Sequence, residues 1–533
     1  MSNIQTGKSH PSIPTHLPLR FWLILLLIAA AALVARLIPN PRTIDDAFIT
    51  FRYSRNLLDG LGFVYNPGIH TLGTTTPLWT LIMAFTGGLL NGRDFPAYAL
   101  ALSAAADAIT CILIFLLARR LTRSDYFAAI PALLWAVAPM SVTFAIGGME
   151  TSLNILWMFA AFSLYILIPT AELPRRKRWR EAAIGICAAL GFLTRADAVL
   201  WIAPLLGWQF LEGLRTRRLP LITWLAVGIV LLPWVIFSIA QFGSPIPNSV
   251  TAKRNAYLIE PLSAFAGLLR TYSNLFFAFD TFGSIGTMIS GIIVLVCTLF
   301  AFPYTTRKLP RILPLFLYPW LYFAVFSALN PLMFRWYFAP PLPALMLAVF
   351  TGFWALLAPL QNTRIKAAIP FIAGAFGLLC LITSLNAWTL HPTHGANRPA
   401  PQMAWHEIEL LYQEMGEYLR DDLGVTAETR VASADIGAIG FFSGATIVDT
   451  VGLVTPELRE YYPVDQAIIV EGQNYAIPPQ LILDTQPEFL VTMEAFVRYG
   501  LAQQTEFLEQ YTLIREIPTG FYGDSMQLWG RNP

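Results

Sequence analysis

Two adjacent aspartates, Asp45 and Asp46, stand directly after the first long apolar run of the sequence. An ionised pair next to a membrane is costly to keep, because a carboxylate is strongly hydrated. Such a pair is suited to accepting a proton as a general base or to holding a divalent metal ion. The competing interpretation is that both aspartates stabilise the N-terminus of a helix that begins there, where negative charge is favoured.

A second group of residues is suited to binding an anion. On a helix that begins at Asp45, Arg52 lies on the same face, together with Phe48 and Ile49, so that a carboxylate and a cation line one edge. Preorganised cations stabilise a leaving group on which negative charge grows. Each cation is also open to the interpretation that it reaches lipid headgroups. The remaining candidates for an anion site are Arg195, Lys253, Arg254 and Arg335.

Several other kinds of site have no signature in the sequence. It contains no CxxC or HExxH metal spacing, no phosphate-binding loop and no GxGxxG that opens a helix after a strand. A nucleotide-sugar site and nucleic-acid binding are therefore not supported. The four cysteines lie in apolar runs, where we expect them to pack as small apolar residues; they are Cys111, Cys187, Cys297 and Cys380.

The composition indicates an integral membrane protein. Hydrophobic residues make up 56% of the chain and charged residues 13%, and the mean hydropathy is +0.56, which exceeds what a water-soluble globule needs. The run 21–38 is long enough to span a bilayer, whereas 78–90 is too short and is predicted to lie at the interface. Ten further predicted spans, which make eleven in all, lie near 96–118, 126–146, 150–170, 181–194, 197–211, 220–241, 284–303, 312–329, 334–358 and 367–388.

The basic residues predict an orientation, because they gather in cytoplasmic loops. With eleven spans, Lys8 and Arg20 fall on the same side as the basic loops near 119–123, 175–180, 215–218, 307–311 and 364–366. We therefore expect the N-terminal segment 1–20 in the cytoplasm and the membrane domain at 21–390. The aspartate pair then faces outward, in a first outer loop at 39–95.

Residues 391–533 are expected to form a separate extracytoplasmic domain. This tail contains 20 acidic residues against seven Arg and no Lys, which we interpret as a solvated surface. MAWHEIELLYQEMGEYLRD has helical spacing; RVASADI, ATIVDTVGL and PEFLVTM are typical of strands; and YTLIREIPTGFYGDSMQLWGR is typical of a hairpin. The predicted fold class is thus a polytopic α-helical membrane protein, with about eleven transmembrane helices and a C-terminal soluble α/β or α+β domain.

A series of motifs resembles the GT-C class of integral membrane glycosyltransferases. The resemblance is to the branch similar to mycobacterial terminal arabinofuranosyltransferases and related polyprenyl-phosphate-sugar enzymes, and it runs from about residue 40 to 455. The tail is comparatively small for the arabinosyltransferase pattern. The motifs are DDAFITFRYSRNLLDGLGFVYNPG followed by TTTPLW, then GMETSL, LTRADAVL, GSPIPNSVTAK, RWYFAP and GAIGFFSGATIVDTVGL.

This resemblance implies transfer of a sugar from a polyprenyl phosphate to a glycan, lipid or protein acceptor outside the cytoplasmic membrane. The acceptor proton needs a base, whereas the departing phosphate is a stable anion, so one carboxylate suffices. Asp45 is the expected base, and Asp46 is expected to orient the acceptor or to hold a metal ion; no other cofactor is implied. The expected ligands of the donor phosphate are Arg195 and Lys253, with Arg52 and Arg335 beside them.

Three further residues are expected to contact the acceptor or the sugar. Glu150 lies at the mouth of a span, where a helix-start carboxylate is an equally good interpretation. Trp79 is suited to stacking on a sugar, although interfacial aromatic belts are rich in the same residue. Changes near Asp449 in the tail are expected to alter acceptor use. Asp107, in the middle of the second span, is expected to make a structural hydrogen bond inside the bundle.

Two functions of other classes remain open. A flippase or transporter of lipid-linked sugars would carry polar residues near the bilayer midplane and would have two related halves. A non-enzymatic membrane scaffold would depend on the tail and would tolerate loss of the aspartates. The expected partners are the lipid-linked donor, an envelope acceptor and the bilayer, without nucleic acid.

Overall fold

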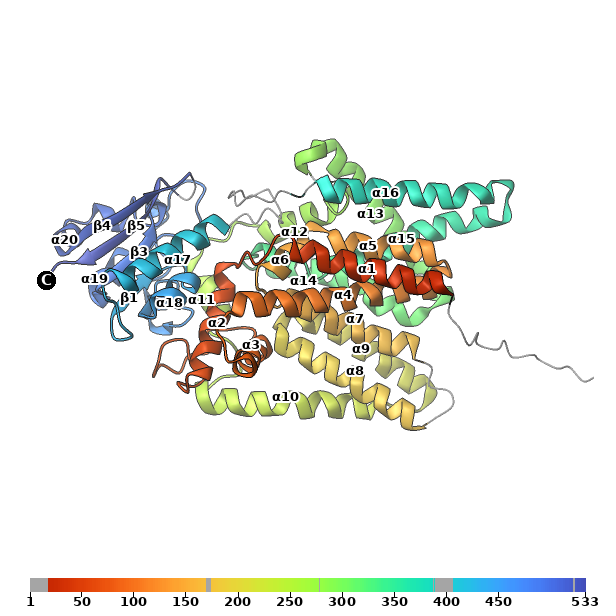
Figure 1. Ribbon diagram of the computed structural model, residues 1–533, viewed down its shortest axis with the longest axis horizontal. Helices are drawn as coiled ribbons and strands as arrows, with labels where there is room; N and C mark the ends of the chain where they lie inside the picture. The colour runs from red at the N-terminus through yellow and green to blue at the C-terminus, as the bar shows by residue number, and fades with distance from the viewer. Residues whose placement is uncertain (1–17, 169–173, 278, 387, 389–405, 521–522) are drawn as a thin grey trace, which may run out of the picture.

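The computed structural model describes residues 18–168, 174–277, 279–386, 388, 406–520 and 523–533. Long helices form an elongated bundle, and a smaller domain with a β-sheet lies at one end of it (Figure 1). The N-terminal end of helix α1 lies at the opposite end of the bundle. The two parts meet around helix α2.

Eleven helical rods occupy the positions of the eleven predicted spans, if α5 and α6, bent by 45° at their junction, count as one. Among the described residues, however, only seven helices are long and apolar enough to cross a membrane, or eight with the bent pair. The predicted number of spans is therefore not confirmed. The helices of the bundle are α1 (Leu19–Leu37), α4 (Phe95–Thr122), α5 (Asp125–Val137), α6 (Pro139–Ile146), α7 (Thr151–Leu167), α8 (Pro174–Thr194), α9 (Val199–Thr216), α10 (Leu221–Phe242), α13 (Phe279–Lys308), α14 (Leu313–Leu329), α15 (Leu342–Leu357) and α16 (Ile369–Asn386).

Three of the rods account for the difference. Helix α7 has 17 residues, slightly fewer than a span needs. Helix α8 starts with the basic sequence PRRKRWRE, and α9 ends with Glu212 and Arg215, so the apolar part of each is short. The predicted spans near 150–170, 181–194 and 197–211 depend on the apolar parts of these helices alone.

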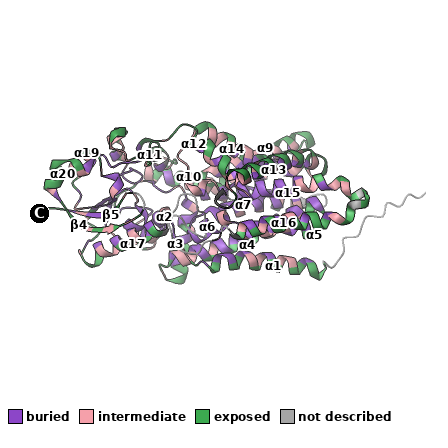
Figure 2. Cartoon of the chain, turned by 90° about the horizontal axis from the view of Figure 1, so that it is seen from above, coloured by how far each residue is buried: buried purple, intermediate pink, exposed green. Residues whose placement is uncertain are grey.

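The outer surface of the bundle is apolar. Exposed residues lie along the long helices of the bundle (Figure 2), and they include many large apolar ones, such as Ile229 and Leu232 on α10. Only 11% of the apolar window of α10 is buried, compared with 61% for the central helix α4. Such a surface is suited to lipid, and the protein is accordingly a multi-pass membrane protein.

A buried ion pair joins α1 to α4, close to the C-terminal end of α1. The Arg36 guanidinium on α1 donates to Asp107 on α4 at 2.7 Å, and Ser152 on α7 donates to the same carboxylate oxygen at 2.9 Å. Arg36 also donates to the hydroxyl of Ser141 on α6. The structural role expected for Asp107 is therefore confirmed, and the sequence had not identified its partner.

Short helices lie between the bundle and the sheet domain. Helix α2 (Asp45–Leu58) begins at Asp45, as predicted, and both aspartates lie in its first turn, where negative charge interacts favourably with the helix dipole. Helix α3 (Pro77–Leu90) occupies the segment that was expected to be too short to span. Two further short helices are α11 (Ser249–Ala256) and α12 (Ser263–Ser273).

The tail contains one mixed five-stranded sheet. Its strand order is β2-β1-β3-β5-β4; β1 pairs in parallel with β2 and β3, and β5 pairs antiparallel with β3 and β4. The predicted helix, strands and hairpin are confirmed. The elements are α17 (His406–Asp421), β1 (Arg430–Ser433), α18 (Gly437–Ser443), β2 (Thr446–Asp449), α19 (Pro479–Thr485), β3 (Phe489–Met493), α20 (Thr505–Gln510), β4 (Tyr511–Pro518) and β5 (Ser525–Arg531).

Candidate active site

A cavity of about 580 Å³ lies where the bundle meets the tail. One part of its wall is apolar, formed by Phe326 and Leu329 at the end of α14 and by Leu453 of the tail. The other part is polar and charged. Its charged residues come from four separate segments of the chain; they are Asp46, Glu150, Arg195, Asp197, Lys253 and Arg254. Concave sites with a few convergent polar groups are typical of small-molecule binding.

Asp46 and Lys253 face each other across this wall. The Lys253 ammonium donates to an Asp46 carboxylate oxygen at 3.3 Å, and both side chains are partly exposed, 18% for Lys253 and 29% for Asp46. The ammonium also lies 4.4 Å from the centre of the Phe334 ring. Burial, the largest single effect, lowers the pKa of Lys253, but Asp46, Tyr337 and Asp449 together outweigh it, and the pKa is raised. Lys253 is therefore a permanent cation in the cavity.

Asp45 points toward the tail instead. Its carboxylate accepts hydrogen bonds from the backbone N–H of Gly437 at 2.9 Å and of Ala438 at 2.7 Å. Burial, together with the charges of Asp435 and Asp46, raises the pKa of Asp45 to about 8, although the two amides oppose this shift. Asp45 is not among the described residues that line the cavity. This position does not fit a base that must reach an acceptor in the cavity.

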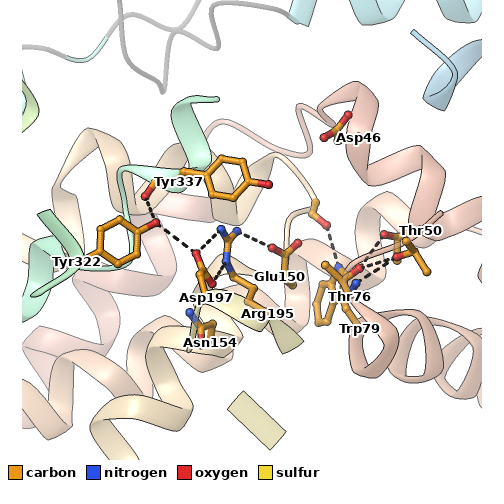
Figure 3. A network of polar contacts seen from close by, with 12 residues as sticks. Asp46, Thr50, Thr76, Trp79, Glu150, Asn154, Arg195, Asp197, Tyr322 and Tyr337 are labelled. Carbon is orange, nitrogen blue, oxygen red and sulfur yellow. Dashed lines mark hydrogen bonds and ion pairs between the residues drawn. The ribbon is translucent and has the colours of Figure 1, made fainter. Parts of the chain in front are cut away.

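Arg195 lies between two carboxylates (Figure 3). It donates to Asp197 from two nitrogens, at 3.0 and 2.8 Å, and to Glu150 at 2.7 Å. The hydroxyl of Tyr322 joins Asp197 to the carbonyl of Tyr337. Two carboxylates thus hold Arg195 by three hydrogen bonds, whereas Lys253 pairs with Asp46 alone at 3.3 Å, so Lys253 is the more available of the two cations to a phosphate. All three charged residues nevertheless line the cavity.

Arg52, expected beside the donor phosphate, is instead a contact between the two parts of the molecule. It is 1% exposed, and its guanidinium donates to the carbonyls of Tyr65, Gly440 and Ala445 and to the side chain of Asn66. Its donors are engaged by the protein, and it does not line the cavity in the described structure. Sequence reasoning placed it on the correct helix face but could not know that the tail covers that face.

The other expected site residues, Trp79, Asp449 and Arg335, are not among the described residues that line the cavity. Trp79 is buried, and its indole N–H donates to the carbonyl of Gly148 at 3.0 Å, so it supports the Glu150 loop. Asp449 is buried and accepts N–H bonds from Val451, Gly452 and Val454; it shapes the tail loop that brings Leu453 to the cavity. Arg335 is half-buried, and the cavity wall next to it is formed by Trp336 and Tyr337.

Other residues at the site had no assigned role from sequence. Asp197 follows Arg195 by two positions within the LTRAD motif, and that spacing was the available signal. Thr50 and Thr76, joined by a 3.1 Å hydrogen bond between their hydroxyls, line the cavity beside Asp46 (Figure 3). No sequence signal pointed to Glu409, which accepts a hydrogen bond from the backbone N–H of Asp45 at 3.0 Å.

The carboxylates do not converge on a metal site. Within the part of the chain that the structure describes, no group of three or more His, Cys, Asp or Glu residues is placed to hold a metal ion. Asp46 faces the Lys253 ammonium and Asp45 faces two amide N–H groups. A cation held by this pair would have to replace those contacts, so the residues present do not fit the metal site that the sequence left open.

Known proteins share parts of this sequence. The family described as dolichyl-phosphate-mannose-protein mannosyltransferase matches residues 74–239, and a domain of unknown function (DUF8728) matches 401–529. A terminal β-(1→2)-arabinofuranosyltransferase of Mycobacterium tuberculosis is 28% identical over 222 residues. That match covers 39% of this chain, and the chain spans about a third, 34%, of the relative's length.

Solved structures share the fold over almost the whole chain. ArnT from Cupriavidus metallidurans in the apo state superimposes with a TM-score of 0.58 at 13% identity, and covers 95% of this chain and 97% of its own. The resemblance to GT-C glycosyltransferases is confirmed. An oligosaccharyltransferase from Archaeoglobus fulgidus has a TM-score of 0.53 at 14% identity, over 94% of this chain and 72% of its own. Because both alignments cover at least 94% of this chain, the shared fold includes the bundle and most of the tail.

Proposed function

We propose that this protein is a membrane glycosyltransferase that transfers a sugar from a polyprenyl-phosphate donor to a hydroxyl group of an extracytoplasmic glycan, lipid or protein. The observation that carries the proposal is the pairing of Asp46 and Lys253, 3.3 Å apart, on the wall of one cavity. A base and a cation are the two groups that such a transfer requires. The structural neighbour from Cupriavidus metallidurans has also been solved with undecaprenyl phosphate bound.

Asp46 is the base in this proposal, in place of Asp45. The Asp46 carboxylate takes the proton of the acceptor hydroxyl while the acceptor oxygen forms a bond to the anomeric carbon of the sugar. The bond from that carbon to the phosphate oxygen breaks, and the electron pair leaves with the polyprenyl phosphate. The departing anion needs no proton, because Lys253 stabilises its charge, with Arg254 at the exposed edge of the cavity.

The remaining charged residues are assigned to the sugar. Glu150 and Asp197 line the cavity and accept hydrogen bonds from Arg195, which fixes the orientation of both carboxylates. Carboxylates held in this way can accept hydrogen bonds from sugar hydroxyls, and bonds to a charged acceptor are about twice as strong as neutral ones. Arg195 thus acts on the sugar through its neighbours rather than on the phosphate.

The apolar part of the cavity wall suits the lipid portion of the donor. Leu329 is 74% exposed although it lines the cavity, so an apolar surface continues from the site to the outside of the protein. A transporter would instead bind its substrate between related halves near the midplane, whereas this cavity lies at the end of the bundle, against the tail.

The proposed orientation keeps the N-terminus in the cytoplasm and the tail outside the cytoplasmic membrane. Arg20 and Arg119 both pair with Asp125, and Figure 1 shows this end of α1 opposite the sheet domain. Basic residues at the end remote from the cavity support a cytoplasmic location for that end.

A transfer assay tests the proposed function. The purified protein should move labelled sugar from a polyprenyl phosphate into an envelope acceptor fraction, and it should not use the same sugar on a nucleotide. Transfer from the nucleotide sugar alone, or movement of the lipid-linked sugar across a vesicle membrane without transfer, would contradict it.

A further inference from the structure

The first residue of α2 is held by the tail from two sides. The two carboxylate oxygens of Asp45 accept hydrogen bonds from consecutive backbone amides, Gly437 and Ala438, at the start of α18. The backbone N–H of Asp45 donates to the Glu409 carboxylate of α17 at 3.0 Å. Two elements of the tail therefore fix both the backbone and the side chain of one residue in the membrane domain.

The contact depends on a glycine. A Cβ atom at Gly437 would lie 1.8 Å from the carbonyl oxygen of Asp45 and 2.7 Å from its carboxylate, distances that no real side chain tolerates. Three residues later, a Cβ at Gly440 would lie 2.0 Å from the hydroxyl of Tyr65 and 2.5 Å from the guanidinium of Arg52. The face of α18 that packs on α2 thus has no side chains at these two points, which allows the backbones to approach.

Asp46 follows directly in the same helical turn. Its carboxylate faces Lys253 and the cavity, while that of Asp45 faces the tail. Successive side chains on a helix diverge by about 100°, because one turn contains 3.6 residues. The first turn of a helix is the part that frays most easily, since its N–H groups lack partners within the helix. Fixing Asp45 therefore fixes the direction in which Asp46 points.

We propose that Asp45 is a positioning residue, held by the Gly437 and Ala438 amides of the tail so that Asp46 is correctly oriented in the cavity. The inference rests on the proposed function, in which Asp46 is the base. It makes the tail a structural part of the catalytic centre rather than only a module that recognises the acceptor.

The attachment of the tail does not depend on this contact alone. The Arg52 guanidinium donates to the carbonyls of Gly440 and Ala445, and the Asn248 side chain donates to the carbonyls of Gly452 and Leu453. These bonds hold the same two parts together at other points. The Asp45 contact differs from them because it ends one residue from Asp46, the proposed base.

Variants of two glycines on α18 distinguish a role in orienting Asp46 from a role in attaching the tail to the membrane domain. Gly437→Ala should lower kcat by tenfold or more while the donor KM changes less than threefold, because a displacement of about 1 Å at reacting groups can cost 10²-fold in rate. Gly440→Ala crowds Arg52 and Tyr65 and should lower the Tm with little change in kcat of the folded protein. Gly520→Ala, where a Cβ meets nothing within 4 Å, is the matched control.

Asp45→Asn covers the case in which Gly437→Ala does not fold. The amide keeps one acceptor for the two N–H groups, so kcat should again fall about tenfold at an unchanged donor KM. Equal losses of kcat in Gly437→Ala and Gly440→Ala, or wild-type kcat in both Gly437→Ala and Asp45→Asn, would overturn the inference. Asp46→Asn, measured in parallel, keeps the two proposals apart. If the Gly437 and Asp45 variants overturn the inference while Asp46→Asn is inactive, only the positioning role has failed. If Asp46→Asn is fully active, the proposed base has failed.

Discussion

Replacing Lys253 by glutamine tests the proposed phosphate contact. Lys253 is the cavity cation that pairs with Asp46 at 3.3 Å, and its side chain is only 18% exposed, so its charge is poorly screened by water. A hydrogen bond to a charged group contributes about 1.5–3 kcal/mol, and each 1.4 kcal/mol corresponds to about a tenfold change. We therefore expect kcat/KM for the donor to fall about 10- to 100-fold.

Steady-state transfer, with each substrate varied in turn, measures this effect. Lys253→Gln should raise the donor KM and should also lower kcat to the extent that the contact tightens as the phosphate departs. Lys253→Arg keeps the charge and should recover part of the loss. Lys366→Gln, the same change at an exposed position in the short 3₁₀ helix between α15 and α16, is the matched control. An unchanged donor dependence beside a raised acceptor KM would refute the assignment.

Three further predictions concern stability and orientation. The pKa of Asp45 is raised from about 4 in the unfolded chain to about 8 in the folded protein, so between these values the folded protein binds the extra proton and its free energy of unfolding should fall as the pH rises from about 4 to 8. In thermal unfolding, Asp45→Asn should show a smaller fall of the Tm over this range, and a pH dependence identical to that of the wild type would contradict this. Arg52→Gln should lower the free energy of unfolding by roughly 2–4 kcal/mol, because buried carbonyls lose their hydrogen-bond partner, without changing the KM of the folded protein for the sugar donor. A raised KM for the sugar donor would mean that Arg52 contacts the donor phosphate. A phosphatase fused to the C-terminus should be active, and an inactive one with a fluorescent cytoplasmic reporter at the same place would reverse the proposed orientation.

The positions of the helices and strands could be predicted from the sequence more accurately than the number of membrane spans. The start of α2 at Asp45 and the strands of the tail follow from local patterns, such as acidic residues at a helix start and alternating apolar residues. The number of spans depends on α7, α8 and α9. Helix α7 is short, and α8 and α9 each carry charged residues at one end, so the apolar length of a segment does not decide whether it crosses the membrane.

The site was predictable in its motifs but not in its side-chain directions. Asp46, Glu150, Arg195 and Lys253, all expected site residues, line one cavity. The directions of Asp45 and Arg52 depend on the tail, whose carbonyls and amides contact them from almost 400 positions away in sequence. Local spacing on a helix gives a shared face, but it does not show what covers that face.

The most direct test of the account compares the two aspartates at saturating donor and acceptor. Asp46→Asn should lower kcat by about 10²-fold or more, because general-base catalysis typically contributes 10²–10⁴, while Asp45→Asn should lower it only about tenfold. Both variants should fold, since each change is isosteric and the Asp46 side chain is 29% exposed. A loss of 10²-fold in Asp45→Asn together with near-normal turnover in Asp46→Asn would contradict the assignment of Asp46 as the base.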